Sequence, residues 1–97
     1  MRESDLERAL VQATEARGGR AFKFVSPGMA GVADRLLLRP VPPEHREIVQ
    51  RYIKLVEVKA PGKQLRPLQQ WFQREVQGLG HCCVVVDSRE AVRELLA

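Results

Sequence analysis

The chain has 97 residues, a length that supports one hydrophobic core and therefore predicts one small domain spanning residues 1–97. Apolar residues make up 44% and charged residues 29% of the chain, proportions that exclude a disordered protein. The net charge of +4 favours a polyanionic partner but does not identify it.

The cysteines and the absence of long apolar segments predict the compartment. Cys82 and Cys83 are adjacent in an apolar stretch, where a strand would point them to opposite faces, so we expect reduced thiols with a structural role. The sequence has neither a basic start followed by an apolar block nor an apolar run of membrane-spanning length. We therefore expect a cytoplasmic protein with no membrane partner.

The N-terminal part of the chain is predicted to form a helix and two strands. Apolar residues recur at helical spacing over residues 4–17, and Gly18-Gly19 follow as a typical helix end. Residues 21–25 are short and apolar and lead into Ser26-Pro27-Gly28, which indicates a strand and then a turn. Residues 32–39 predict a second strand that stops before a proline.

The next part of the chain is predicted to contain a third strand and a strong helix. Residues 44–51 fit either a short helix or a hairpin arm, and residues 52–59 predict the strand. Pro67 begins an amphipathic helix that ends before Gly80. The apolar stripe of this helix consists of Leu68, Trp71, Phe72, Val76 and Leu79.

The chain is predicted to end with an apolar strand over residues 82–86 and a helix capped by Ser88. The inward-facing residues of that helix are expected to be Val92, Leu95 and Leu96. The full order is then α-β-β-β-α-β-α, which predicts an α/β fold with one mixed sheet flanked by helices. The first three strands would form a meander, and the third and fourth strands would be parallel, joined by a right-handed crossover.

Charged residues interrupt the end of the predicted third strand. Because side chains alternate along a strand, Glu57 and Lys59 project from the same face as Leu55. A carboxylate and an ammonium group at a strand end can bind a divalent cation and hold the water or phosphate that the cation activates. The alternative is a strand end that has reached the surface, with both charges solvated.

Asp34 provides a second carboxylate from a different segment, and neighbouring strands would bring Asp34 and Glu57 onto one ion. It also fits a turn aspartate after Gly31. Hydrolysis of a phosphodiester needs a deprotonated water and neutralised phosphoryl charge, which Mg²⁺ or Mn²⁺ held by hard oxygens supplies. Lys59 would then orient the attacking water and stabilise the negative transition state.

Six short strings follow one another along almost the whole chain. They are Gly18-Gly19, Lys23-Phe24-Val25-Ser26-Pro27-Gly28, Gly31-Val32-Ala33-Asp34-Arg35, Val56-Glu57-Val58-Lys59-Ala60-Pro61-Gly62, Leu65-Arg66-Pro67-Leu68-Gln69, and Gly80 through Val86-Asp87-Ser88. In these strings and in the order of its elements the chain resembles the VRR-NUC family of the PD-(D/E)xK, or restriction-endonuclease-like, nucleases. Two departures matter: Ala33 stands where the family usually has proline, and residues 41–51 look longer than the usual link, which indicates an added contact surface.

The resemblance implies a metal-dependent, structure-specific DNA endonuclease, with resolution of four-way (Holliday) junctions as the expected activity, in a bacterial cell or a phage-infected host. It implies that Mg²⁺ or Mn²⁺ is bound by Asp34, Glu57 and the main-chain carbonyl of Val58. Lys59 is implied to be catalytic, and the amide of Gln69 is implied to hold Lys59 or a bridging water.

The resemblance also implies that a glutamate of the first helix reaches the metal site. Glu7 is the favoured residue, although Glu3 lies one turn earlier and could take the same place. Ser4-x-x-Glu7 also matches a capping box, in which the Glu7 side chain would bond to the backbone of Ser4. Both interpretations of Glu7 stay open at this point.

Basic residues around the predicted site would contact DNA phosphates, which gives salt-dependent affinity without sequence selectivity. They are Arg20, Lys23, Arg35, Lys63 and Arg66. Cutting both strands of a junction needs two active sites, so a homodimer is expected. One alternative is a nucleic-acid-binding or assembly module that has the nuclease fold but does not cut, and the intact Asp34, Glu57 and Lys59 argue against it. Another is a plain α/β scaffold, which would require the order of the six strings to be accidental.

Overall fold

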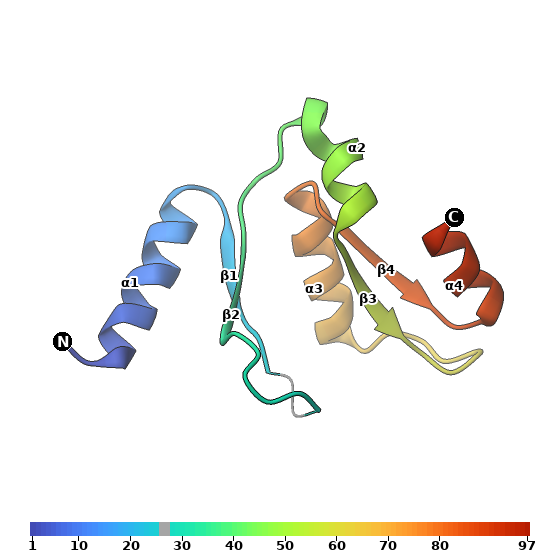
Figure 1. Ribbon diagram of the computed structural model, residues 1–97, viewed down its shortest axis with the longest axis horizontal. Helices are drawn as coiled ribbons and strands as arrows, with labels where there is room; N and C mark the ends of the chain where they lie inside the picture. Colours follow the sequence, from blue (N-terminus) through green and yellow to red (C-terminus); the bar gives the residue numbers. More distant parts are fainter. Residues whose placement is uncertain (26–27) are drawn as a thin grey trace. The chain divides into compact units, whose positions relative to one another are not determined.

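A computed structural model describes residues 1–25 and 28–97 (Figure 1). The structure is mixed α/β and forms two compact units, Met1–Pro40 and Val41–Ala97. Its elements are α1 (Glu3–Ala16), β1 (Arg20–Lys23), β2 (Arg35–Leu38), α2 (Pro43–Tyr52), β3 (Lys54–Val58), α3 (Pro67–Gly78), β4 (Cys82–Val86) and α4 (Arg89–Leu96). The assignment of residues 1–97 to a single VRR-NUC domain stays a prediction.

The first unit begins with the predicted helix, α1. The capping box of Ser4 and Glu7 would require the helix to begin directly after Ser4, but it begins earlier. Arg2 is the N-cap residue, and its main-chain N–H donates a hydrogen bond to Asp5 Oδ2 over 3.1 Å. Ser4 therefore lies inside the helix, and the capping-box interpretation of Glu7 is wrong. The helix ends at the predicted glycines, where Gly18 has φ +82, a conformation that glycine adopts without steric cost.

Strands β1 and β2 form the predicted antiparallel pair, with Lys23 opposite Arg35 and Arg20 opposite Leu38. Both strands are shorter than the apolar pattern predicted. Beyond the Lys23–Arg35 pair, the main-chain hydrogen bonding between the two segments ends with a bond from the Phe24 N–H to the Asp34 carbonyl, over 2.8 Å. The predicted turn at Ser26-Pro27 lies outside the described residues. Helix α1 packs against β1, so this unit is a two-stranded sheet with a helix on one face (Figure 1).

The second unit begins with a helix that corrects the predicted order of elements. Residues 43–52 form α2, so the order is α-β-β-α-β-α-β-α, and Tyr52 belongs to this helix instead of the third strand. Pro43 occupies the first turn, where its fixed φ suits a helix and its missing N–H costs nothing. The last turn closes with a bond from the Ile53 N–H to the Val49 carbonyl, over 3.0 Å.

Strands β3 and β4 are parallel, as predicted, and are joined through α3. Helices α3 and α4 both pack against β4 and lie on either side of it in Figure 1. Val76 of α3 is fully buried against this sheet, together with Cys83 and Val86. Leu68 and Leu96 were predicted to face inward but are 79% and 77% exposed, because each lies in a terminal turn of its helix, where fewer neighbours cover a side chain.

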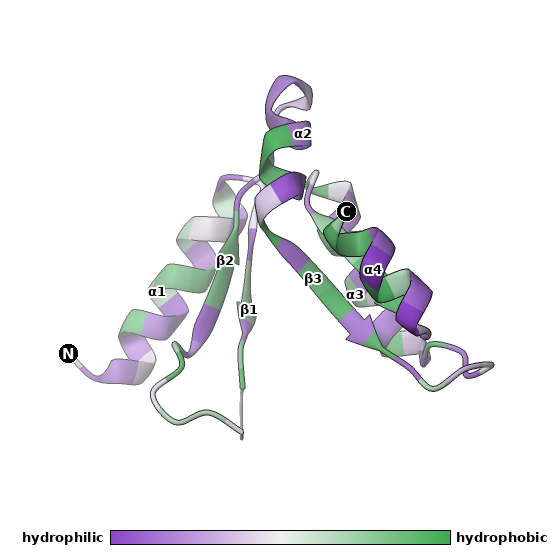
Figure 2. Cartoon of the chain, turned by 45° about the vertical axis from the view of Figure 1, so that its right-hand side comes forward, coloured by the Kyte–Doolittle hydropathy of each residue, from purple (hydrophilic) through white to green (hydrophobic). Residues whose placement is uncertain are grey.

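The strand pairs form two sheets of two strands each, β1–β2 and β3–β4. The restriction-endonuclease-like arrangement of one mixed sheet stays a prediction. Ser88 caps α4 as predicted, accepting a bond from the Ala91 N–H over 3.0 Å. Helices α1 and α4 carry both hydrophilic and hydrophobic residues, as amphipathic helices do (Figure 2). Across the described part of the chain, no helix has the length and apolar character needed to span a membrane.

Candidate metal and phosphate site

The first unit brings two of the predicted acidic residues to one pocket. Glu7 of α1 and Asp34, directly before β2, line an open cavity of about 440 Å³ together with Lys23 at the end of β1. The remaining lining is largely apolar and comes from the segments between the two strands. Glu3, the alternative to Glu7, is exposed and does not line this cavity. The structure therefore favours Glu7 as the glutamate of this pocket.

Asp34 is held through its backbone and leaves its side chain available. Its carbonyl accepts the Phe24 N–H over 2.8 Å, which fixes the residue at the loop end of the hairpin. Gly31, with φ +83, forms the turn that precedes it. Within residues 1–25 and 28–97 the Asp34 carboxylate makes no hydrogen bond or ion pair, so it does not act as a turn aspartate bonded to its own backbone. An exposed carboxylate of this kind can accept a cation.

The second unit holds Glu57 in a defined position. Gln69, in the first turn of α3, donates a hydrogen bond from Nε2 to Glu57 Oε1 over 2.7 Å, and its own Oε1 accepts the Arg66 N–H over 2.9 Å. The resemblance implied that this amide holds Lys59 or a water, whereas the structure places it on the carboxylate. Glu57 Oε2 receives no hydrogen bond from any described residue, so this oxygen is available to a ligand.

Lys59 and the Val58 carbonyl lie beside Glu57 at the end of β3. The Lys59 N–H donates to the Val86 carbonyl over 3.0 Å, so the ladder with β4 extends one residue beyond the strand. Because backbone groups alternate in direction along a strand, the Val58 carbonyl points to the edge of β3 away from β4. Lys59 is half-buried. That its side chain shares a face with Glu57 stays a prediction from the alternation of side chains along a strand.

The oxygen donors of the two units suit a hard divalent cation. The first unit offers the carboxylates of Glu7 and Asp34, and the second offers one Glu57 oxygen and the Val58 carbonyl. Within either unit, no cluster of three or more His, Cys, Asp or Glu side chains occurs among the described residues.

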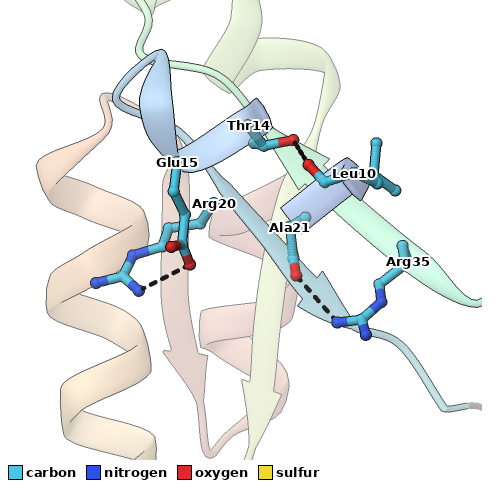
Figure 3. Close-up of polar contacts among 6 residues, drawn as sticks. All are labelled: Leu10, Thr14, Glu15, Arg20, Ala21 and Arg35. Carbon is cyan, nitrogen blue, oxygen red and sulfur yellow. Dashed lines mark hydrogen bonds and ion pairs between the residues drawn. The ribbon is translucent and has the colours of Figure 1, made fainter. Parts of the chain in front are cut away.

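The predicted phosphate contacts fall into two groups. Arg20 and Arg35 already make contacts inside the first unit: Arg20 Nη1 lies 3.8 Å from Glu15 Oε1, and Arg35 Nη1 donates to the Ala21 carbonyl over 3.2 Å (Figure 3). Lys23, Lys63 and Arg66 are exposed, with Lys63 in the loop after β3. These three side chains are better placed than the two arginines to meet a phosphate.

Cys83 is a buried free thiol of β4 that sequence analysis treated as structural. Burial raises the pKa of this thiol, and the nearby charges of Cys82 and Glu57 raise it further. Its carbonyl accepts the Gln77 side-chain amide over 2.8 Å, which ties α3 to β4. A thiol kept protonated in this way is a poor nucleophile, so Cys83 belongs to the core and not to the site.

Sequence reasoning missed two side-chain contacts of these units. The first is the Gln69 bond to Glu57, and the second is an ion pair in which Arg35 Nε lies 3.7 Å from Glu7 Oε1. The position of Gln69 in the first turn of the helix after β3 is a sequence signal for the first contact. No spacing in the sequence indicates the second, because it joins a helix to a strand of a later segment.

These features define a mixed α/β protein that presents carboxylates suited to a divalent cation. The chain is 39% identical over 90 residues to the protein named "Putative nuclease p44" of Acyrthosiphon pisum secondary endosymbiont phage 1, an alignment that covers 93% of this chain and 87% of the phage protein. The chain therefore belongs to the family of that phage protein. No family model matches the chain, and no solved structure matches it.

Proposed function

We propose that this protein is a nuclease that hydrolyses phosphodiester bonds in DNA with the help of Mg²⁺ or Mn²⁺, and that it is a VRR-NUC member of the PD-(D/E)xK superfamily. The observation that carries the proposal is the Glu57 carboxylate, which accepts a hydrogen bond from Gln69 over 2.7 Å two residues before Lys59. The relationship to a phage protein named as a nuclease supports the same chemistry.

The ligands we propose for the cation are Asp34, Glu57 and the Val58 carbonyl, with Glu7 as a further carboxylate. When bound, such a cation lowers the pKa of a water and neutralises charge on the phosphoryl oxygens. Gln69 fixes one oxygen of Glu57, so the carboxylate does not have to be ordered when substrate arrives.

Lys59 is proposed to act on the reacting atoms. Its ammonium is a compact donor that can hydrogen-bond to the attacking water and to the phosphoryl oxygen on which charge develops. The half-buried position strengthens that interaction, because the effective dielectric constant is lower there than in open solvent. Lys59 is therefore assigned to transition-state stabilisation and not to substrate binding.

The proposed substrate is branched DNA, such as a four-way junction, cut by a homodimer. Exposed Lys23, Lys63 and Arg66 would contact the phosphate backbone, which contains no sequence information. Helix α2 is proposed as part of the dimer contact, since it lengthens the link between β2 and β3 and leaves Ile48 58% exposed. Two copies would place one active site on each strand of a junction.

The test is a cleavage assay on four-way junction, flap and linear duplex DNA, with Mg²⁺, with Mn²⁺ and with a chelator. Glu57→Gln and Lys59→Ala should abolish metal-dependent cutting, whereas Glu90→Gln, which removes an exposed carboxylate of α4 that lies 3.3 Å from Arg93, should not. Equal DNA binding and no cutting by any version, including the wild type, would show a non-catalytic nucleic-acid-binding module instead. Size-exclusion chromatography with light scattering would test the dimer separately.

A further inference from the structure

Arg35 is tied to two elements of the first unit at once. Its Nη1 donates to the Ala21 carbonyl of β1 over 3.2 Å, and its Nε lies 3.7 Å from Glu7 Oε1 of α1. The Arg35 side chain is only 22% exposed, and that of Glu7 is 38% exposed. A guanidinium group that spans a strand and a helix in this way holds the helix carboxylate in place.

One buried donor of Arg35 has no hydrogen-bond acceptor among the described residues. Arg35 Nε is buried and makes no hydrogen bond with any described residue, and 3.7 Å is too long for such a bond. The charged oxygen that faces this donor belongs to Glu7, so a shift of less than about 1 Å would convert the ion pair into a charge-assisted hydrogen bond. A buried donor without a partner is costly, which favours retention of the pair.

Glu7 connects this pair to the proposed metal ligands. Its carboxylate lines the cavity shared with Asp34 and Lys23, and it also lines a second open cavity of about 520 Å³ on the Arg35 side. Two carboxylates that face one cavity repel each other before a cation binds. The positive charge of Arg35, which lies 3.7 Å from Glu7 and does not line this cavity, offsets the repulsion.

We infer that Arg35 is a positioning residue, which sets the Glu7 carboxylate at the Asp34 cavity, and that it is not one of the phosphate contacts. This inference rests on the proposed nuclease function. A phosphate bound at Nη1 or Nε of Arg35 would have to displace the Ala21 carbonyl or the Glu7 carboxylate. Arg66 is exposed, and its side chain makes no comparable contact with the described residues, so it provides the matched comparison.

The first experiment separates positioning from phosphate binding. Affinity for a four-way junction is measured in chelator over a range of salt concentrations for the wild type, Arg35→Gln and Arg66→Gln. Loss of one phosphate contact lowers the slope of log K against log salt by about 1, which we expect for Arg66→Gln. We expect the slope of Arg35→Gln to equal that of the wild type, and a slope reduced as in Arg66→Gln would overturn the inference.

The second experiment asks whether Arg35 acts through Glu7. Single-turnover cleavage should be slowed by about 10-fold or more in Arg35→Gln, the size of effect seen when a supporting partner of a ligand is removed. In a Glu7→Gln background, Arg35→Gln should change the rate less than about twofold, because the group that it positions is gone. Arg35→Lys should not rescue, since an ammonium cannot reach both partners as a fork does. Equal losses in both backgrounds would contradict the inference.

A third measurement is independent of catalysis. The melting temperatures of wild type, Arg35→Gln, Glu7→Gln and the double variant are compared without DNA or metal. The shift caused by Arg35→Gln should be smaller in the Glu7→Gln background than in the wild type, and strictly additive shifts would overturn the pairing. If no version cuts any DNA, the nuclease proposal fails, and this cycle still decides whether Arg35 holds Glu7.

Discussion

Gln69 Nε2 donates a hydrogen bond to Glu57 Oε1 over 2.7 Å, which fastens the first turn of α3 to the end of β3. The same amide is fixed on its other side, where Oε1 accepts the Arg66 N–H over 2.9 Å. Because both ends of the amide are bonded, its orientation is determined, and the orientation of one Glu57 oxygen is determined with it. A hydrogen-bond partner that orients a metal ligand in this way typically strengthens binding of the metal.

Replacing Gln69 with leucine should weaken Mn²⁺ binding by about 10- to 100-fold, because Glu57 loses the partner that orients it. Isothermal titration calorimetry with Mn²⁺ measures the change. Gln70→Leu is the matched control, since Gln70 donates to the Leu65 carbonyl over 3.0 Å and has no bond to Glu57. Equal Mn²⁺ affinities for the two variants would remove Gln69 from the site.

Replacing Lys59 with methionine should slow DNA cleavage by about 100-fold or more while leaving Mn²⁺ binding in place, since the proposed role of Lys59 is felt in the transition state. Single-turnover rates at saturating protein measure this effect. Lys54→Met is the control from the other end of β3, where the Lys54 ammonium donates to the Gln50 carbonyl over 2.6 Å. A similar loss of rate in both variants would indicate damage to the strand instead of lost catalysis.

Gly19 and Gly78 should respond in opposite directions to alanine. A Cβ at Gly19 would lie 2.5 Å from the Leu38 carbonyl oxygen and 3.2 Å from Thr14 Cγ2, so Gly19→Ala should lower the free energy of unfolding by about 1–3 kcal/mol. At Gly78 in α3 a Cβ meets no atom within 4 Å, and Gly78→Ala should raise the free energy of unfolding by about 0.5–1 kcal/mol. Urea denaturation followed by circular dichroism tests both, and a stabilised Gly19→Ala variant would contradict the close approach of Gly19 to the Leu38 carbonyl.

The Cys83 thiol should make the protein less stable in alkaline solution. Its pKa is raised in the folded state, chiefly by burial and then by the charges of Cys82 and Glu57, so the folded chain holds this proton more tightly than the unfolded chain. The contribution is complete below the pKa of an unfolded thiol, about 8.5, and is lost as pH rises through the raised folded pKa. Melting temperatures between about pH 7 and pH 10 should therefore fall more steeply for the wild type than for Cys83→Ala. Parallel curves would contradict burial of this thiol.

The sequence by itself determined most of the helices and strands. Periodic apolar residues, the glycines after α1, Pro67 and the Ser88 cap are signals that act within a few residues, so they locate elements without knowledge of the fold. The parallel pairing of β3 with β4 also followed, because a helix between two strands favours it. The Glu44–Arg51 stretch left two possibilities open, since a segment with few apolar residues fits several local structures.

Only the tertiary structure decided which polar groups meet. Gln69 bonds Glu57 and not Lys59, and Glu7 meets Arg35 and not the backbone of Ser4. The distance between two side chains from different elements depends on how the elements pack, and a spacing in sequence does not contain that information. The physical reason is that hydrogen bonds and ion pairs act over about 3–4 Å, so small differences in packing select one partner over another.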